Sequence, residues 1–379
     1  MKNRVFIMTG EVSGDLHASR LVRSLKALDN SIDFYGVGGC EMEREGVSLL
    51  YNISQFEAFG IVQPILNLRF YKNALNSIRR FIQEKSIDTV ILTDFPGFNM
   101  MLASRLKKDN VKVIYYISPQ IWAWRYSRIK KIKKYIDAMI VLYPFEETLY
   151  RKEEVRAFFE GNPLVDIVDE RLRENNDIDE KISSPCICLL PGSRISEIKR
   201  HLPPMMQAAE ILKERYNASF IIPVLSGKNE RYIIEKLKKI NNQKIDPHIV
   251  VDNACKAMEK SDILILSSGT ATLEAAIIGK PMIVIYRIGL FNEMLARLLI
   301  KVDKISLVNI IAGKEVCPEL LQREVNAKRI FYEVAKLLDN RNLYDDMIKN
   351  IKSTTDKLSG SGAIDKIAKK VLSLIYEKL

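Results

Sequence analysis

The stretch Ile263-Leu-Ile-Leu-Ser-Ser-Gly-Thr-Ala-Thr-Leu-Glu274, which continues to Gly279-Lys-Pro281, decides the fold class. Its first residues form a short apolar run, which is typical of a parallel strand buried on both faces. The residues from Ala271 onward have a helical composition, and Gly279 and Pro281 end that helix. The segment therefore predicts a strand, a sharp turn and a helix, which is the repeating unit of an α/β protein with a parallel sheet.

The turn of this unit places small and hydroxyl side chains at the amino end of a helix. Free backbone amides and the positive end of the helix dipole favour an anion there. We therefore predict that Ser268, Gly269 and Thr270 bind a phosphate, and that Glu274 accepts hydrogen bonds from a ribose. An ordinary strand-to-helix turn capped by Ser or Thr stays open as an interpretation. The turn has neither the spacing of a Walker loop nor that of the Gly-x-Gly-x-x-Gly turn.

The composition is that of a globular protein with an anionic partner. The 379 residues are enough for two domains. Because no apolar run is long enough to span a bilayer and no signal-peptide core follows Met1, we expect a cytoplasmic protein. Five cysteines without a Cys-x-x-Cys pair, and only three histidines, predict free thiols and no structural zinc. The net charge of +11 predicts binding to nucleic acid, a membrane surface or phosphorylated substrates.

A Gly-rich turn, Thr9-Gly-Glu-Val-Ser-Gly-Asp15, follows the first predicted strand, residues 4–8. The carboxylates of Glu11 and Asp15 would repel a phosphate, so this turn suits sugar hydroxyls better. The alternative is that Ser13 and Asp15 only cap helix amides.

A third turn follows the strand at residues 89–93 and begins with Asp94. A carboxylate at the carboxyl end of a strand in a doubly wound sheet points into the crevice where ligands bind. Asp94 therefore has the placement of a general base, although a helix-capping Asp is the alternative. We expect Asn99 to be the N-cap of the next helix.

Two segments have the character of a surface for lipids. Residues 56–71 are unusually apolar for a connecting segment. They form either a half-exposed apolar surface over a cleft or membrane, or internal core. Residues 125–134 carry six basic side chains and no acid, with Ile129 and Ile132 as a docking stripe. No nucleic-acid-binding motif accompanies them, so an anionic leaflet or phosphorylated lipid fits better, and a solvated charged face remains the alternative. The predicted lipid-binding residues are Phe59, Ile61, Val62, Trp122, Trp124, Arg125, Arg128, Lys130 and Lys131.

A second strand-and-helix series begins at Cys186. Its first turn is Pro191-Gly-Ser-Arg194, in which Arg194 is suited to a pyrophosphate. Further strands are predicted at residues 219–224, 248–251 and 282–286. We therefore expect two doubly wound Rossmann-like domains facing each other across a cleft, residues 1–163 and 164–352. A last helix at residues 353–379 is expected to pack back toward the first domain or against a partner subunit.

Eight motifs together resemble the lipid-A-disaccharide synthase family along nearly the whole chain. The Gly-Glu-x-Ser-Gly-Asp opening and Ser-Pro-x-x-Trp-Ala-Trp-Arg are the most specific of them. The motifs are Thr9–Asp15, Phe59–Val62, Thr93–Asn99, Ser118–Arg125, Leu190–Arg194, Ser268–Glu274, Tyr286-Arg287 and Ser306–Gly313.

The resemblance implies a GT-B glycosyltransferase of family 19 that makes the lipid A disaccharide phosphate and releases UDP. The substrates implied are UDP-2,3-diacylglucosamine and 2,3-diacylglucosamine 1-phosphate, and the place is the inner face of the cytoplasmic membrane. No metal or other cofactor is implied. The competing interpretations are another UDP-sugar enzyme, such as a UDP-N-acetylglucosamine 2-epimerase, or a non-catalytic membrane-surface protein. A monomer and a homodimer are both compatible with the sequence.

The resemblance also implies roles for individual residues. Asp94 is the expected general base, and Glu11 is the second residue we name as catalytic. The acceptor side would be lined by Glu11, Ser13, Gly14 and Asp15, and the donor side by Ser193, Arg194, Thr270, Glu274, Tyr286 and Asn309. Two positions depart from the family pattern: Gln63 stands where a Glu is usual, and Gly97 where an Asp is usual.

Overall fold

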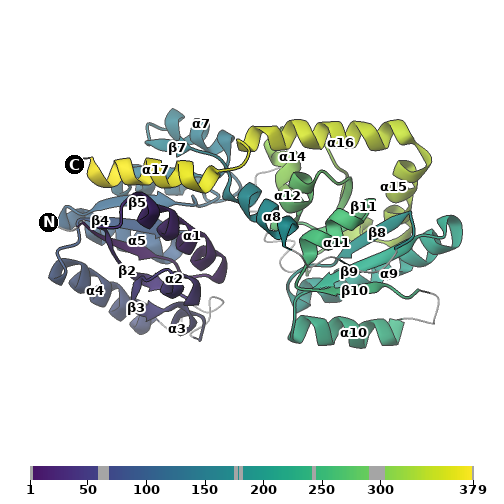
Figure 1. Cartoon of the computed structure of the whole chain (residues 1–379), viewed down its shortest axis with the longest axis horizontal. Helices are drawn as coiled ribbons and strands as arrows, with labels where there is room; N and C mark the ends of the chain where they lie inside the picture. The colour runs from purple at the N-terminus through teal and green to yellow at the C-terminus, as the bar shows by residue number, and fades with distance from the viewer. Residues whose placement is uncertain are drawn as a thin grey trace. The chain divides into compact units, whose positions relative to one another are not determined.

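A computed structural model of the chain describes residues 3–58, 68–174, 178, 182–240, 245–289 and 304–377. The contacts divide the chain into two units (Figure 1). Unit 1 comprises residues 1–163 and 359–379, and unit 2 comprises residues 164–358. The division thus falls after Pro163, and residues 353–358, which the sequence interpretation joined to the last segment, group with unit 2.

Unit 1 is built on a seven-stranded sheet in the order β3-β2-β1-β4-β5-β6-β7, in which every pairing is parallel. Its central strands are apolar and completely buried because helices cover both faces. The strands are β1 (Arg4–Met8), β2 (Asp33–Gly38), β3 (Ser48–Asn52), β4 (Thr89–Thr93), β5 (Lys112–Tyr116), β6 (Ala138–Val141) and β7 (Ala157–Phe159).

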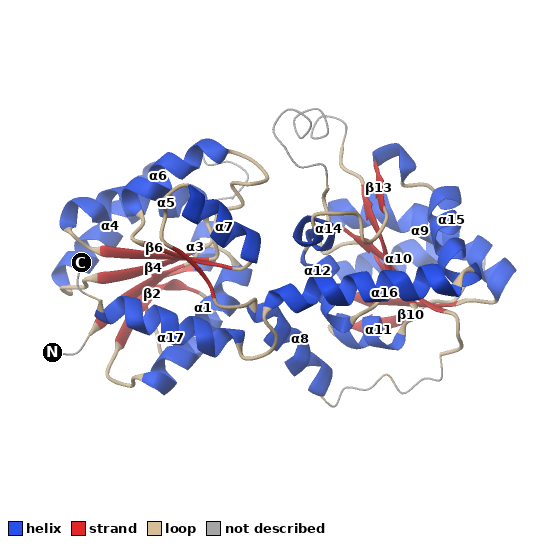
Figure 2. Cartoon of the chain, turned by 90° about the horizontal axis from the view of Figure 1, so that it is seen from above, coloured by secondary structure: helices blue, strands red, loops and turns tan. Residues whose placement is uncertain are grey.

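The helices of unit 1 form a layer on each face of this sheet (Figure 2). One layer contains α1 and α17, and the other contains α4, α5 and α6. The helices are α1 (Val12–Leu28), α2 (Cys40–Arg44), α3 (Ile53–Ala58), α4 (Leu68–Glu84), α5 (Pro96–Leu106), α6 (Ile129–Tyr135), α7 (Pro144–Lys152) and α17 (Ala363–Tyr376), with 3₁₀ turns η1 (Lys107–Asp109) and η2 (Tyr126–Arg128).

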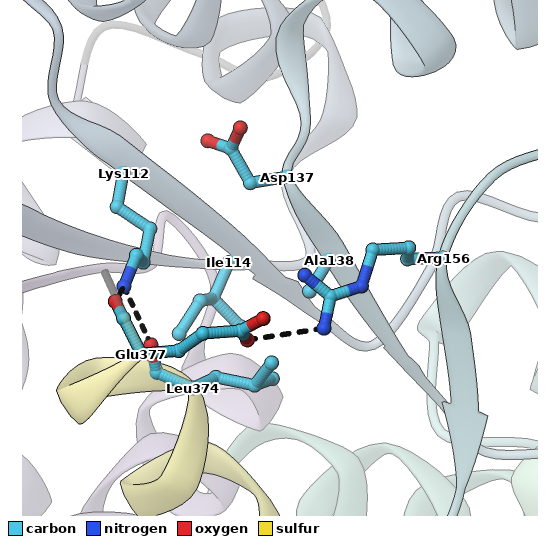
Figure 3. A pocket seen from close by; sticks show the side chains of 7 residues that line it. All are labelled: Lys112, Ile114, Asp137, Ala138, Arg156, Leu374 and Glu377. Atoms are coloured by element: carbon cyan, nitrogen blue, oxygen red, sulfur yellow. Dashed lines mark hydrogen bonds and ion pairs between the residues drawn. The ribbon is translucent and has the colours of Figure 1, made fainter. Parts of the chain in front are cut away.

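The end of the chain is fastened to unit 1 by two basic side chains (Figure 3). The buried ammonium of Lys112 donates to the carbonyl oxygen of Leu374 at 2.7 Å and also to that of Glu377. Arg156 forms an ion pair with the Glu377 carboxylate at 3.0 Å. These residues line a cavity of about 360 Å³ beside the first residues of β5 and β6. The cavity is therefore at the amino ends of the strands, whereas ligands of such sheets bind at the carboxyl ends.

Unit 2 is built on a six-stranded parallel sheet in the order β10-β9-β8-β11-β12-β13. The apolar side chains of α9, α10 and α15 cover one face of it. The strands are β8 (Cys186–Leu190), β9 (Ser219–Val224), β10 (His248–Val251), β11 (Ile263–Ser267), β12 (Met282–Tyr286) and β13 (Glu319–Leu321). The helices are α8 (Pro163–Arg173), α9 (Ile195–Tyr216), α10 (Lys228–Ile240), α11 (Ala254–Lys260), α12 (Thr270–Ile278), α14 (Leu307–Ala312), α15 (Ala327–Asp339) and α16 (Arg341–Thr355), with η3 (Gln322–Glu324) and η4 (Asp356–Leu358).

These two parallel sheets confirm the α/β class predicted from the sequence. They also confirm the stretch from which the prediction began, because β11 is a buried strand and α12 begins at Thr270 and ends before Gly279. None of the helices within the described part of the chain has the length and apolar character needed to cross a bilayer.

Candidate functional site

The four turns with predicted ligand-binding residues lie at the two points where the strand order reverses. In unit 1 the chain runs outward from β1 to β3 and then returns to add β4 on the other side of β1. In unit 2 it runs from β8 to β10 and returns to add β11 beside β8. Crevices open at such reversal points, outside the carboxyl ends of the strands. The topology thus brings the turn after β1 beside the turn after β4, and the turn after β8 beside the turn after β11.

Asp94 directly follows β4 in a strained backbone conformation. Asp94 and Phe95 both have left-handed φ angles, 48° and 45°, which side chains other than glycine rarely adopt. Asn99 braces the turn, since its side-chain amide donates to the carbonyl oxygens of Thr93 at 3.2 Å and Asp94 at 2.7 Å. The prediction that Asn99 is the N-cap of α5 is wrong. The helix begins at Pro96, and the Asn99 side chain turns back toward the strand instead.

The Asp94 turn packs against the turn after β1. A Cβ atom on Gly10 would lie 2.4 Å from the ring of Phe95, so only glycine permits this approach. Burial raises the pKa of the Asp94 carboxyl above its usual value, although the backbone amide of Phe95 opposes the shift. A carboxylate of raised basicity at a strand end suits a general base. Glu11, the second predicted catalytic residue, is at the N-cap position of α1 with its side chain half-buried.

Asp15 connects this turn to the start of α2 by hydrogen bonds. Its carboxylate accepts hydrogen bonds from the backbone amides of Gly39 at 2.7 Å, Glu41 at 3.0 Å and Met42 at 3.2 Å. It therefore caps α2 and not its own helix. Ser13 is exposed at the start of α1, and Gly14 is buried against Thr9.

The sequence interpretation missed Glu146, a carboxylate buried at the start of α7. It accepts hydrogen bonds from the Ser118 hydroxyl at 2.7 Å and the Trp122 indole at 3.0 Å, and from the amides of Leu142 and Tyr143 at 3.2 Å each. Burial raises its pKa to about 7. The local sequence gives no sign of this role, because the contact with Ser118 and Trp122 depends on the tertiary fold. Glu146 thus fixes the loop that follows β5.

The remaining tryptophan, Trp124, stacks with basic side chains. The guanidinium groups of Arg125 and Arg128 lie 4.6 Å and 5.1 Å from the centre of its ring. Ile129 and Ile132 of α6 are buried, as predicted, and Lys130 and Lys131 are exposed. Phe59, Ile61 and Val62, like Gln63, lie outside the described residues.

The described ends of the apolar segment at residues 56–71 belong to the core. Phe56 is buried, and its ring contacts those of Phe70, Tyr71, Phe95 and Phe98. For these ends, internal core is therefore the correct interpretation. Gly97, the second departure from the family pattern, is exposed, and a Cβ atom there would meet no other group within 4 Å.

In unit 2, the turn after β8 is arranged by Glu197 from the first turn of α9. The Glu197 carboxylate accepts from the backbone amide of Arg194 at 3.3 Å and pairs with the Arg194 guanidinium at 3.4 Å. A Cβ atom on Gly192, whose φ angle is 120°, would collide with that carboxylate. The Ser193 carbonyl accepts from the Asn229 side chain at 2.7 Å. Arg194 remains 79% exposed, so it can reach a ligand at this edge of the sheet.

The turn after β11 presents the amino end of α12 to solvent. Gly269 and Thr270 are exposed, and the Ser268 hydroxyl donates to the carbonyl of Ile305 at 2.9 Å. Glu274, one turn into α12, pairs with Arg171 of α8 at 3.2 Å. Burial raises the pKa of Glu274, and Arg171 opposes that shift. Arg171 is a second residue that the sequence interpretation missed.

Asn309 makes all its hydrogen bonds within the protein. Its oxygen accepts from the amides of Val316 at 2.7 Å and Cys317 at 3.1 Å. Its nitrogen donates to the Cys317 carbonyl and the Glu319 carboxylate, both at 2.8 Å. Asn309 therefore holds α14 against the segment before β13. Tyr286 is half-buried at the end of β12.

Comparisons with known proteins agree on one family. The family model described as lipid-A-disaccharide synthetase matches residues 5–371. A lipid-A-disaccharide synthase from Nitrosococcus oceani is 37% identical over 375 residues, which cover 98% of this chain and 96% of that protein. The corresponding enzyme from Syntrophus aciditrophicus is also 37% identical, with 98% and 97% covered.

Solved structures share the fold of this chain at low sequence identity. The UDP-GlcNAc 2-epimerase from Neisseria meningitidis, bound to UDP-GlcNAc, matches with a TM-score of 0.66 at 14% identity, over 98% of this chain and 100% of that one. This likeness supports the GT-B fold that the sequence resemblance implied. Together with the family match, it leads to one conclusion: the chain belongs to the lipid-A-disaccharide synthase family, whose members are glycosyltransferases of lipid A biosynthesis.

Proposed function

We propose that this enzyme transfers 2,3-diacylglucosamine from UDP to the 6-hydroxyl of 2,3-diacylglucosamine 1-phosphate. The products are the β-1,6-linked disaccharide 1-phosphate and UDP. The observation that carries this proposal is the placement of a half-buried carboxylate of raised pKa, Asp94, at the strand-order reversal of unit 1 in a chain of this family.

Asp94 acts as the general base in this mechanism. Its carboxylate takes the proton of the acceptor hydroxyl while the hydroxyl oxygen attacks the anomeric carbon. The bond from that carbon to the diphosphate oxygen breaks in the same step, so the configuration inverts. Glu11, in the adjoining turn, orients the acceptor sugar together with Ser13 and Gly14, and Asp15 keeps this turn in place through its bonds to α2.

Unit 2 holds the nucleotide of the donor. The exposed amides at the start of α12 and the guanidinium of Arg194 stabilise the negative charge that develops on the departing diphosphate. Glu274, held by Arg171, accepts hydrogen bonds from the ribose, and Tyr286 packs against the base. Ser193 and Ser268 shape the two turns. Asn309 supports the turn of Ser268 indirectly, because it donates to the Glu319 carboxylate, which accepts the amide of Ile305, the residue that Ser268 contacts.

The lipid parts of both substrates call for a membrane surface. We assign this contact to the stack of Arg125, Trp124 and Arg128 and to the exposed lysines 130 and 131, because basic and tryptophan side chains favour an anionic interface. The enzyme thus works as a peripheral protein on the inner face of the cytoplasmic membrane.

The test of the base is the Asp94→Ala variant. We expect turnover to fall by a factor on the order of 10² to 10⁴, the usual contribution of a general base, with substrate binding largely kept. Asp88→Ala is the matched control, since Asp88 is exposed just before the opposite end of the same strand. A near-normal kcat for Asp94→Ala would remove the assignment.

A further inference from the structure

His201 of α9 is completely buried and connects two turns of unit 2. Its Nδ1 lies 2.8 Å from the carbonyl oxygen of Pro191, and its Nε2 lies 2.9 Å from the backbone nitrogen of Arg287. A backbone amide can only donate, so Nε2 must accept. Nδ1 therefore carries the hydrogen and donates to Pro191. The two contacts together are compatible with only one form of the ring, the neutral Nδ1–H tautomer.

The two turns that His201 joins lie on either side of β11. Pro191 directly follows β8 and Arg287 directly follows β12, and β11 lies between these strands in the sheet. The imidazole therefore links the carboxyl ends of the two strands that flank the turn at residues 268–270. Its ring centre is 6.2 Å from that of Tyr286.

We propose that His201 is a positioning residue for the nucleoside diphosphate of the donor. By fixing the turn of Arg194 and the segment of Tyr286 relative to each other, it orders both before the ligand binds. When the site is already ordered, binding does not have to supply the free energy of ordering it, so the affinity for the ligand is higher. This inference rests on the proposed function, because it assumes that unit 2 binds the UDP portion of a donor.

The link depends on the charge of the ring. Protonation would place an N–H at Nε2 against the N–H of Arg287, and that hydrogen bond would be lost. Burial lowers the pKa of His201 below its ordinary value. Among neighbouring groups, the Pro191 carbonyl and the Glu197 carboxylate raise this pKa, the Arg200 guanidinium lowers it, and the Tyr286 ring lies 6.2 Å away. The link is thus complete at neutral pH, and it is lost on acidification below the ordinary His pKa of about 6.5.

The experiment compares wild type with His201→Leu and His201→Asn at pH 8. The first variant removes both hydrogen bonds, and the second keeps a donor for Pro191. We expect His201→Leu to raise the Kd of UDP, measured by titration calorimetry, and the KM of the UDP-sugar donor by about tenfold or more, the usual effect of losing one or two hydrogen bonds. The KM of the lipid acceptor should not change. His201→Asn should recover part of the loss.

A second readout follows the Arg287 amide itself. Its hydrogen exchange should become faster in His201→Asn than in wild type, and the Kd of UDP should lose part of its dependence on pH below about 6.5, the range in which the ring would become protonated. Because the terminal phosphate of UDP also titrates near pH 6, the informative quantity is the difference between variant and wild type. Tyr344→Phe is the control. The Tyr344 hydroxyl donates to the Asp262 carbonyl at the amino end of β11, so this variant should lose stability without losing UDP affinity.

The outcomes separate this inference from the proposed function. If wild type fails to bind UDP, the proposed function is wrong. If wild type binds UDP and both His201 variants bind it equally well with unchanged donor KM, His201 is structural only and this inference is wrong. If His201→Leu does not fold, the affinity and exchange rate of His201→Asn decide in the same way.

Discussion

The phenol of Tyr115 donates a 2.6 Å hydrogen bond to the backbone carbonyl of Asp94, the residue we propose as the general base. The same carbonyl accepts the amide of Asn99, so two side chains hold one oxygen of a turn with two left-handed residues. Each such residue costs on the order of 1–3 kcal/mol, which the surrounding contacts must offset. The strained backbone and the two hydrogen bonds that stabilise it are therefore located at the proposed catalytic residue.

We predict that Tyr115→Phe lowers kcat about five- to tenfold, the effect of one hydrogen bond on the position of Asp94. The KM values should change little because Tyr115 is buried below the turn. Steady-state kinetics with both substrates provides the measurement. Tyr344→Phe removes a comparable phenol-to-carbonyl bond in unit 2 and should leave kcat unchanged. Equal rates for Tyr115→Phe and wild type would show that the turn does not need this support.

The rate of transfer should depend on pH through Asp94. A base must be unprotonated, so kcat/KM should rise with pH along an acid limb. Because burial raises the pKa of Asp94, the midpoint of this limb should lie above the ordinary Asp value of about 3.9. The measurement is a pH–rate profile, compared with that of Glu11→Gln to separate the two carboxylates. An acid limb that is unchanged in Asp94→Asn, after its lower rate is taken into account, would assign the titration elsewhere.

Asp15→Asn should destabilise the connection between α1 and α2. The carboxylate accepts three backbone amides, and an asparagine would set its own N–H groups against at least one of them. We expect a loss of about 1–3 kcal/mol, seen as faster hydrogen exchange at residues 39–42 and an earlier unfolding transition. Glu43→Gln on the exposed side of α2 should change stability by no more than about 0.5 kcal/mol. Unchanged exchange in Asp15→Asn would instead favour a direct role with substrate.

Neutralising the exposed basic side chains of α6 should weaken membrane binding. The double variant Lys130→Gln/Lys131→Gln should bind vesicles of anionic phospholipid about 2 kcal/mol more weakly, near 1 kcal/mol for each charge. Binding to vesicles of neutral phospholipid should not change, and added salt should reduce the difference. Lys238→Gln/Lys239→Gln on α10 removes the same charge from another exposed helix. If both double variants lose equal affinity, α6 is not the contact surface.

The buried strands of this fold could be predicted because burial on both faces leaves continuous apolar runs, as in β4, β8 and β11. The strands β3, β7 and β13 could not. All three lie at sheet edges with mostly half-exposed residues, and β7 and β13 have only three residues each, so none of them gives the buried apolar run of a central strand. The turns that follow the buried strands were visible for the same reason as the strands themselves.

The contacts that support the candidate site residues were not visible in the sequence. Arg171 reaches Glu274 from 103 residues away, and the Trp122 indole meets Glu146 across two different strand-to-helix connections. Such pairs can be predicted only when the order of the strands in the sheet is known. For Asn99, the local sequence pattern predicted a helix cap. In the structure its side chain instead donates a hydrogen bond to the carbonyl oxygen of Asp94, in the strained turn.

The central claim is that this enzyme joins two acylated glucosamines. Its most direct test is mass spectrometry of the products formed from UDP-2,3-diacylglucosamine and 2,3-diacylglucosamine 1-phosphate, with UDP measured in parallel. We predict a tetra-acylated disaccharide 1-phosphate and one UDP for each disaccharide, both lost in Asp94→Ala. Release of UDP without a disaccharide, or conversion of soluble UDP-N-acetylglucosamine to its 2-epimer in place of transfer, would contradict the claim.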